Sequence, residues 1–275
     1  MPAENAKPPP SGAPAAQRTR PARSLVAPVV DALDGIGTTV SLTIETLAWL
    51  VRPPFRFGQI LAAMEFIGVE SIFIVALTGT FSGMVLALQT VHSLKTFQAE
   101  GLVGGIVALS LTREISPVFA AIMVTARAGS AWAAELGNMR ITEQIDAITT
   151  MGVSPVQYLL APRLVAAVAM LPLLCVLYSC VGMAGAWLVA VEWLRVDPGI
   201  FVDKVRSMAV PKDLAMGIIK STVFGFLIAA IACRQGFYAS GGARGVGQAT
   251  TRAVVQSAVA ILVSNYVLTS WLTDA

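Results

Sequence analysis

Three ionisable side chains lie inside apolar stretches that carry almost no other charge. Arg113 and Glu114 are neighbours in the stretch from about Leu102 to Ala126, and Lys220 lies in the stretch from about Leu214 to Cys233. A charged group in contact with lipid costs about 3 kcal/mol or more, so each of them must face a protein interior, a partner or water. Two interpretations remain open. The three residues form either a buried pair that only holds helices together or a polar patch in a substrate cavity.

The geometry of a helix predicts how these charges pair. At 1.5 Å per residue Arg113 lies about 16 Å and Lys220 about 14 Å from the outer ends of their stretches, near the middle of a bilayer core about 30 Å thick. Adjacent residues are about 100° apart on a helix, so Arg113 and Glu114 do not easily pair with each other. We therefore expect Glu114 to pair with Lys220 and Arg113 to remain free. Asn265 is expected somewhat nearer the outer face.

The composition is that of an integral membrane protein. The chain has 275 residues, of which 56% are hydrophobic and 13% charged, whereas a soluble domain has about 25% charged residues. The net charge of +3 is too small to indicate nucleic acid as a partner. Its three cysteines lie in apolar runs and it has one histidine, His92. We therefore expect no disulfide framework, no metal site and no cofactor.

Hydrophobic periodicity predicts an all-α integral membrane protein. Residues 1–24 are rich in Pro and Ala and are expected to form a disordered cytoplasmic tail, followed by one membrane domain over 25–275. The segment from Leu25 to Val51 has helical spacing but is interrupted by acids, which predicts a helix lying in the membrane surface. Five membrane-spanning helices follow, at about Val69–Val91, Leu102–Ala126, Leu164–Val191, Leu214–Cys233 and Val254–Leu272.

The positive charges outside these spans predict the orientation. The N-terminal arm and the connectors after the second and fourth spans contain most of the arginines, and with five spans they fall on one side. Positive charge favours the cytoplasmic side, so the N-terminus is predicted inside and the C-terminus outside, in the periplasm.

A short two-faced helix is predicted from about Ala133 to Thr149, between the second and third spans. Its apolar stripe contains Ile141, Ile145 and Ile148. The opposite stripe is polar, and Arg140 lies close enough to Glu143 to pair with it. Such a cytoplasmic helix suits docking to a partner, although a solvated helix without a partner fits the same pattern. The polar stripe contains Glu135, Thr142 and Asp146, with Glu143 beside it.

No motif supports an enzymatic activity. The glycine-rich run Gly241-Gly-Ala-Arg-Gly-Val-Gly247 lacks the Lys-Ser/Thr pair that holds phosphate and magnesium, and it follows a span rather than a strand. A Ser/His/Asp triad is excluded because the single histidine lies at the outer end of the first span. We therefore expect this chain itself not to be an enzyme and not to hydrolyse ATP.

Three runs resemble the MlaE/YrbE permeases, the membrane subunits of ABC transporters that work with MCE-domain proteins. The runs are GTFSGMVLALQ, LTREISPVFAAIMVTARAGSAWAAELGNMRITEQIDAITTMGVSP and GGARGVGQATTRAVV. The resemblance covers about Leu25 to Thr273. It implies a homodimer in the bacterial inner membrane, a separate ABC ATPase, an MCE protein on the outer side, and transport of phospholipid or a related lipid between the inner and outer membranes.

The resemblance also assigns roles to residues. It implies that the segment Glu135 to Ile148 is the coupling helix that docks into the ATPase, with contacts from Glu135, Met139, Arg140, Glu143 and Asp146. Depth and pairing, rather than the resemblance, lead us to expect that Arg113 touches an anionic lipid head group while Glu114 and Lys220 shape the pocket, with Asn265 as a fourth candidate substrate-binding residue. An ion-coupled secondary transporter that uses the intramembrane charges as a relay, or a membrane scaffold that assembles partners, remain the alternative functions.

Overall fold

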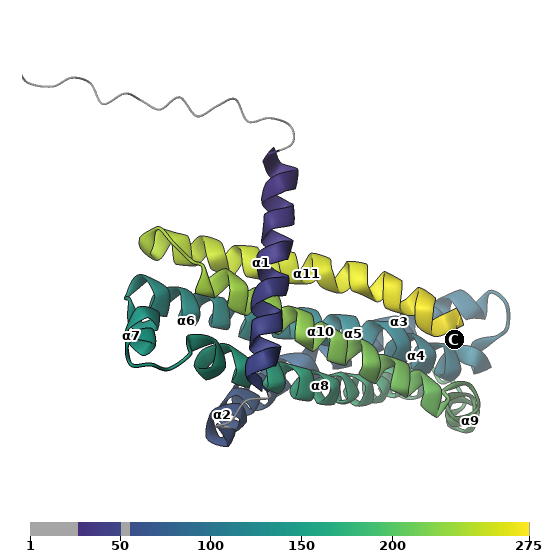
Figure 1. The fold of residues 1–275 in the computed structure, drawn as a ribbon. Coiled ribbons are helices and arrows are strands. Elements are labelled where there is room, and N and C mark those ends of the chain that lie inside the picture. The colour runs from purple at the N-terminus through teal and green to yellow at the C-terminus, as the bar shows by residue number, and fades with distance from the viewer. Residues whose placement is uncertain (1–26, 51–55, 275) are drawn as a thin grey trace, which may run out of the picture. The chain divides into compact units, whose positions relative to one another are not determined.

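The structure is a computed structural model that describes residues 27–50 and 56–274, and every regular element in these ranges is a helix (Figure 1). This confirms the predicted all-α class. The predicted disordered tail, residues 1–24, lies outside the described residues. The α-helices are α1 Ala27–Leu50, α2 Phe57–Gly68, α3 Ile72–Lys95, α4 Val103–Ser110, α5 Ser116–Val124, α6 Ser130–Ile141, α7 Gln144–Thr150, α8 Ala161–Trp187, α9 Pro198–Met208, α10 Pro211–Phe237 and α11 Gly242–Asp274.

Contacts divide the chain into two compact units, Met1–Thr38 and Thr39–Ala275. The first unit contains the beginning of α1, and the second contains the remainder of α1 and every other helix. The helix α1 covers most of the segment for which an interfacial helix was predicted, while its position in a membrane surface remains a prediction. The account below concerns the second unit.

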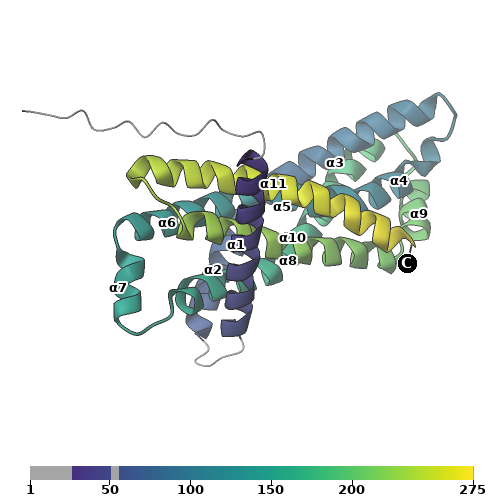
Figure 2. The same ribbon diagram turned by 45° about the horizontal axis from the view of Figure 1, so that its top comes forward.

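Five helical stretches of the described chain are long and apolar enough to cross a membrane, which confirms the predicted number. Short 3-10 and π-helical turns join α2 to α3, α4 to α5 and α5 to α6, so that each of these sets continues as one stretch. The stretch containing α8 packs against α3 and α10, and α11 packs against α10 and α6 (Figures 1 and 2). The stretches are Phe57–Lys95, Glu100–Ile141, Val156–Trp193, Pro211–Phe237 and Gly242–Leu272.

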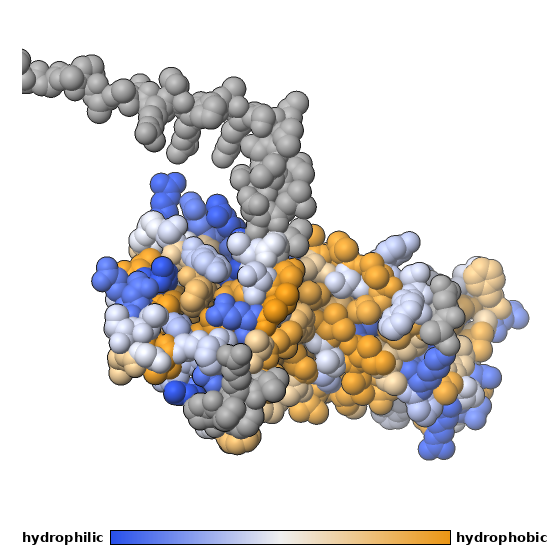
Figure 3. Space-filling model, viewed as in Figure 1, coloured by the Kyte–Doolittle hydropathy of each residue, from blue (hydrophilic) through white to orange (hydrophobic). Residues whose placement is uncertain are grey.

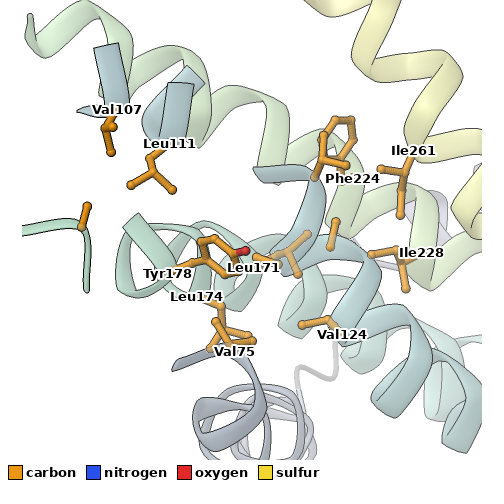
Figure 4. Packing of buried hydrophobic residues seen from close by; sticks show 14 of the residues in the cluster. Val75, Val107, Leu111, Val124, Leu171, Leu174, Tyr178, Phe224, Ile228 and Ile261 are labelled. Carbon is orange, nitrogen blue, oxygen red and sulfur yellow. The ribbon is translucent and has the colours of Figure 1, made fainter. Parts of the chain in front are cut away.

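The core is formed where these stretches meet (Figure 4). Tyr178 of α8 is fully buried and lies among branched aliphatic side chains from α3, α8 and the α4–α5 joint. Gly79 and Gly83 of α3 are four positions apart, a spacing of small residues that favours close helix contact. A Cβ atom at Gly83 would collide with the backbone of Gly182, so α3 and α8 lie in backbone contact there.

Polar and apolar residues are segregated along the helical stretches (Figure 3). Orange, apolar residues cover the middle of the visible face, while hydrophilic residues gather at its two ends. We call these the α7 end, with α6, α7 and the start of α11, and the α9 end, with α9 and the last turns of α11 (Figure 1). An apolar band between two polar ends is the surface that a bilayer requires.

The second span is longer than predicted. The expected end at Ala126 rests on the charge of Arg127, but the helical stretch continues to Ile141. The guanidinium of Arg127 donates to Glu70 Oε2 at 2.7 Å, to Ser71 Oγ at 2.8 Å and to the carbonyl oxygen of Phe66. Because its charge is satisfied by the α2–α3 joint, Arg127 does not have to lie beyond the helix end.

The prediction of a single helix over Ala133–Thr149 is wrong, because the structure has two helices there. The stretch stops at Ile141, and α7 begins only at Gln144. Between them Glu143 adopts the left-handed conformation, with φ of 60°. The break turns α7 back, so that Ile145, 2% exposed, packs in a cluster with Leu136, Leu160 and other apolar residues. Burial of this side chain offsets the strained backbone.

Candidate functional site

A cavity of about 280 Å³ opens between the α4–α5 joint, α10 and α11. It contains three of the four residues for which a substrate-binding role was predicted, and the fourth, Asn265, reaches it through a hydrogen bond to Glu114. The sequence prediction therefore identified residues that are together in space. The lining residues are Leu109, Ser110, Arg113, Glu114, Met216, Lys220 and Thr269.

The predicted pairing of Glu114 with Lys220 is confirmed. Lys220 Nζ lies 2.7 Å from Glu114 Oε1, and its side chain is only 2% exposed. The same ammonium donates to the carbonyl oxygen of Arg113 at 3.0 Å and to Thr269 Oγ1 at 2.8 Å. An ammonium group has three N–H donors, so all donors of Lys220 are in use.

Glu114 is the centre of this network. One carboxylate oxygen accepts from Lys220, and the other accepts from Asn265 Nδ2 at 3.0 Å, while Thr269 Oγ1 lies 3.3 Å from both. The sequence predicted that Asn265 lies somewhat nearer the outer face. Its hydrogen bond to Glu114 instead places it at the level of Glu114. These contacts fix the position of the Glu114 carboxylate.

Arg113 is not free, and this corrects the sequence-based expectation. Its Nε and Nη2 atoms lie 2.6 and 2.5 Å from Asp213 Oδ1, and Asp213 is 2% exposed. The other oxygen of Asp213 accepts from the backbone N–H of Val210 at 2.9 Å, at the start of α10. The Arg113 side chain itself is 44% exposed, so the guanidinium is held by Asp213 on one side and faces the open cavity on the other.

A π-helical turn, Leu111–Ile115, presents both charges to α10. Such turns insert one residue into an α-helix and are frequent at functional sites. From adjacent positions, Arg113 reaches the first turn of α10 and Glu114 reaches Lys220, about 10 Å farther along that helix at 1.5 Å per residue. Two ion pairs are therefore stacked along α10. Arg113, Glu114 and Lys220 line the cavity, and the buried Asp213 contacts Arg113.

The residues predicted to couple to an ATPase lie together at the α7 end but differ in what they contact. Glu135 Oε2 lies 2.9 Å from Arg163 Nη2 of α8, so it has a partner within the chain. Arg140 pairs with Asp146 at 2.7 Å rather than with Glu143, because the chain breaks at Glu143. Met139 packs against the apolar cluster beneath α7.

The side chains at the α7 end also differ in how exposed they are. Glu143 and Asp146 are exposed, and Met151, just after α7, is 78% exposed. All three predicted coupling acids are exposed, but Glu135 and Asp146 each form an ion pair with an arginine in the described chain, so Glu143 is the acid most available to a partner. The sequence analysis did not predict a coupling role for Met151. The signal that could have pointed to it is its position between a short helix and Gly152.

Asp213 is the main site residue that the sequence reasoning missed. The sequence placed it in the polar connector before the fourth span, as an ordinary outward acid. Its position three residues after Val210, with Pro211 at the helix start, is typical of an acid in the first turn of a helix. The spacing of seven residues to Lys220 puts the two side chains on the same side of α10, and that was the signal for a shared cavity wall.

Comparison with known proteins agrees with this architecture. A family model described as "Permease MlaE" matches residues 60–271. A probable ABC transporter permease of Rickettsia bellii is 41% identical over 234 residues, covering 85% of this chain and 90% of the relative. The intermembrane phospholipid transport system permease protein MlaE of Haemophilus influenzae is 38% identical over 231 residues, covering 83% and 88%. Protein TRIGALACTOSYLDIACYLGLYCEROL 1, chloroplastic, of Arabidopsis thaliana is 39% identical over 222 residues, covering 81% and 63%. With five helices able to cross a membrane, the chain belongs to the MlaE family of ABC transporter permeases.

Proposed function

We propose that this chain is the membrane subunit of an ABC transporter that moves phospholipid, or a related lipid, between the inner and outer membranes of a bacterium. The relative from Haemophilus influenzae is named as an intermembrane phospholipid transport permease, which supports this class of substrate. The single observation that carries the proposal is the charged cavity of about 280 Å³ with Arg113 exposed in it. A planar guanidinium binds phosphate through two parallel hydrogen bonds.

The cavity also supports the proposed second copy of the chain. The side chains of Arg113 and Glu114 are 44% and 40% exposed, although they lie within helices that cross the membrane. Charged groups open to lipid are costly, so another protein surface or water must cover them. A second copy with its own half-cavity would enclose the lipid between two such walls. An MCE protein on the outer side would then exchange lipid with this cavity.

The energy source is proposed to be a separate ATPase docked at the α7 end. The exposed acids Glu143 and Asp146 and the exposed Met151 form a protruding polar and apolar surface there. Reversing Glu143 to Lys should weaken assembly with the ATPase or uncouple hydrolysis from lipid movement. Transport at the wild-type rate by Glu143→Lys would argue that α7 is a solvated loop helix.

Photocrosslinking tests the cavity. Benzoylphenylalanine in place of Leu109, which lines the cavity, should capture phospholipid when the full-length chain is embedded in nanodiscs. Adding Arg113→Ala should lower capture several-fold while the chain still binds its ATPase. If Arg113→Ala prevents folding and the surviving protein still captures lipid, Arg113 is structural and the lipid site lies elsewhere.

An ATP requirement distinguishes the transporter classes. An ion-coupled transporter would use Glu114 and Lys220 as a proton relay and would move lipid in proteoliposomes without an ATPase. We expect no movement without the ATPase partner and ATP. Lipid movement driven by a proton gradient alone would favour the relay and contradict the proposal.

A further inference from the structure

The two ion pairs stacked along α10, three of whose side chains line the cavity, have no net formal charge. Arg113 and Lys220 contribute two positive charges, and Asp213 and Glu114 contribute two negative charges. Asp213 and Lys220, the two partners on α10, are each 2% exposed, so bulk water does not screen their charges. In a medium of low dielectric constant the charges of such a wall act on a ligand at close range.

The two pairs differ in what they can offer to a ligand. In the pair of Lys220 with Glu114, the ammonium uses all three of its donors, on Arg113, Glu114 and Thr269. In the pair of Arg113 with Asp213, the described residues engage the guanidinium only through its Nε and Nη2 atoms. Both atoms contact the same oxygen of Asp213. A guanidinium has five N–H groups, so Arg113 keeps donors for a ligand while Lys220 does not.

We propose that Asp213 determines the head-group charge that the cavity accepts, and that it selects phospholipids with no net charge. This inference rests on the proposed lipid-binding function. A phosphate that binds the open side of Arg113 also approaches the carboxylate of Asp213, which repels it. A zwitterionic head group brings a cationic amine with its phosphate, and the amine offsets this repulsion. A monoanionic head group has no such charge.

The structure fixes Asp213 for this role. Its two oxygens are occupied separately, one by Arg113 and one by the Val210 backbone N–H. It lies in the first turn of α10, where the helix dipole stabilises negative charge. The carboxylate is therefore held beside Arg113. A site with Arg113 but without this acid would carry one net positive charge and would prefer anionic lipid.

The test measures head-group preference in Asp213→Asn. The full-length chain with benzoylphenylalanine at position 109 is placed in nanodiscs containing equal amounts of labelled phosphatidylglycerol, which is anionic, and phosphatidylcholine, which is zwitterionic. We expect the ratio of captured phosphatidylglycerol to phosphatidylcholine to rise about tenfold relative to wild type, which corresponds to about 1.4 kcal/mol. The matched control is Asp203→Asn on the exposed side of α9, which removes the same charge outside the cavity and should leave the ratio unchanged.

A ratio unchanged in Asp213→Asn, or one that rises equally in Asp203→Asn, would overturn the inference while leaving the proposed lipid site intact. Capture of neither lipid in any variant would overturn the proposed function and the inference together. If Asp213→Asn does not fold, the charge-balanced double variant Arg113→Gln, Asp213→Asn is measured instead. It should capture less of both lipids and keep the ratio within about twofold of wild type. A tenfold change of that ratio in either direction would also overturn the role of Asp213.

Discussion

Two charged networks of the described chain, one at the cavity and one at the α7 end, are built differently. In the cavity, Lys220 and Asp213 are almost completely buried, and Glu114 has bonds from three side chains. At the α7 end, the pair of Arg140 with Asp146 is exposed on both sides, at 39% and 60%. Buried pairs are costly to break because one charge is left without water or partner, whereas exposed pairs contribute little. The comparison indicates rigid charge placement in the cavity and adaptable charge at the α7 end.

The largest effect is expected from Lys220→Ala. It leaves Glu114 without its cationic partner at membrane depth, which should cost about 3–5 kcal/mol of stability. Thermal unfolding of the purified chain in detergent should show a strongly lowered transition temperature or no folded protein. The double variant Glu114→Gln, Lys220→Met should recover most of the loss. Wild-type stability of Lys220→Ala would remove the distinction between the two networks.

Arg163→Ala should have an intermediate effect. Arg163 is 10% exposed in its side chain and joins α8 to Glu135 of α6, which is 58% exposed. Water can therefore solvate Glu135 when the arginine is lost, and we expect a destabilisation of about 1–2 kcal/mol. Thermal unfolding measures it, with Glu135→Gln as the matched change from the exposed side. If Arg163→Ala lowers stability as much as Lys220→Ala does, the Arg163–Glu135 pair behaves like the buried pairs at the cavity.

Glu143→Gly should stabilise the chain slightly. Glu143 has a φ of 60°, a conformation that glycine adopts without a steric penalty. Relief of this strain should raise stability by up to about 1 kcal/mol, whereas Glu143→Ala should not. Unfolding in a denaturant series distinguishes the two variants. Equal stability of the two variants would show that the left-handed backbone carries no measurable cost.

The smallest effect is expected from Arg140→Ala. Both partners in the pair with Asp146 are exposed, so its loss should change stability by about 0.5 kcal/mol or less. Thermal unfolding at low and high salt checks this, because any contribution should vanish at high salt. A loss that persists in salt would mean that Arg140 supports α7 by packing.

Much of the fold could be predicted from local patterns. The five spans follow from apolar stretches long enough to cross a bilayer, and the Glu114–Lys220 pair follows from matching depth on neighbouring helices. The close approach of α3 and α8 follows from the spacing of Gly79 and Gly83. In each case a single local property, either length, depth or residue size, decides the structure.

The errors arose where a residue satisfies its charge through the tertiary structure. Arg127 reads as the end of a span, but Glu70 and the Phe66 carbonyl, more than fifty positions earlier, accept its hydrogen bonds. Arg113 reads as unpaired because Asp213 lies in a different segment, one hundred positions away. The break at Glu143 depends on where Ile145 finds an apolar cluster. Sequence patterns within one helix contain no information about such distant partners.

The continuous second stretch, from Glu100 to Ile141, gives the protein a lever. Arg113 at the cavity and Ile141 at the base of α7 lie on one run of helical turns, about 42 Å apart at 1.5 Å per residue. If this run pivots near Ile141, a tilt of about 5° displaces Arg113 by about 4 Å, more than the length of a hydrogen bond. Small angular changes at the α7 end would thus become ångström-scale changes at the cavity.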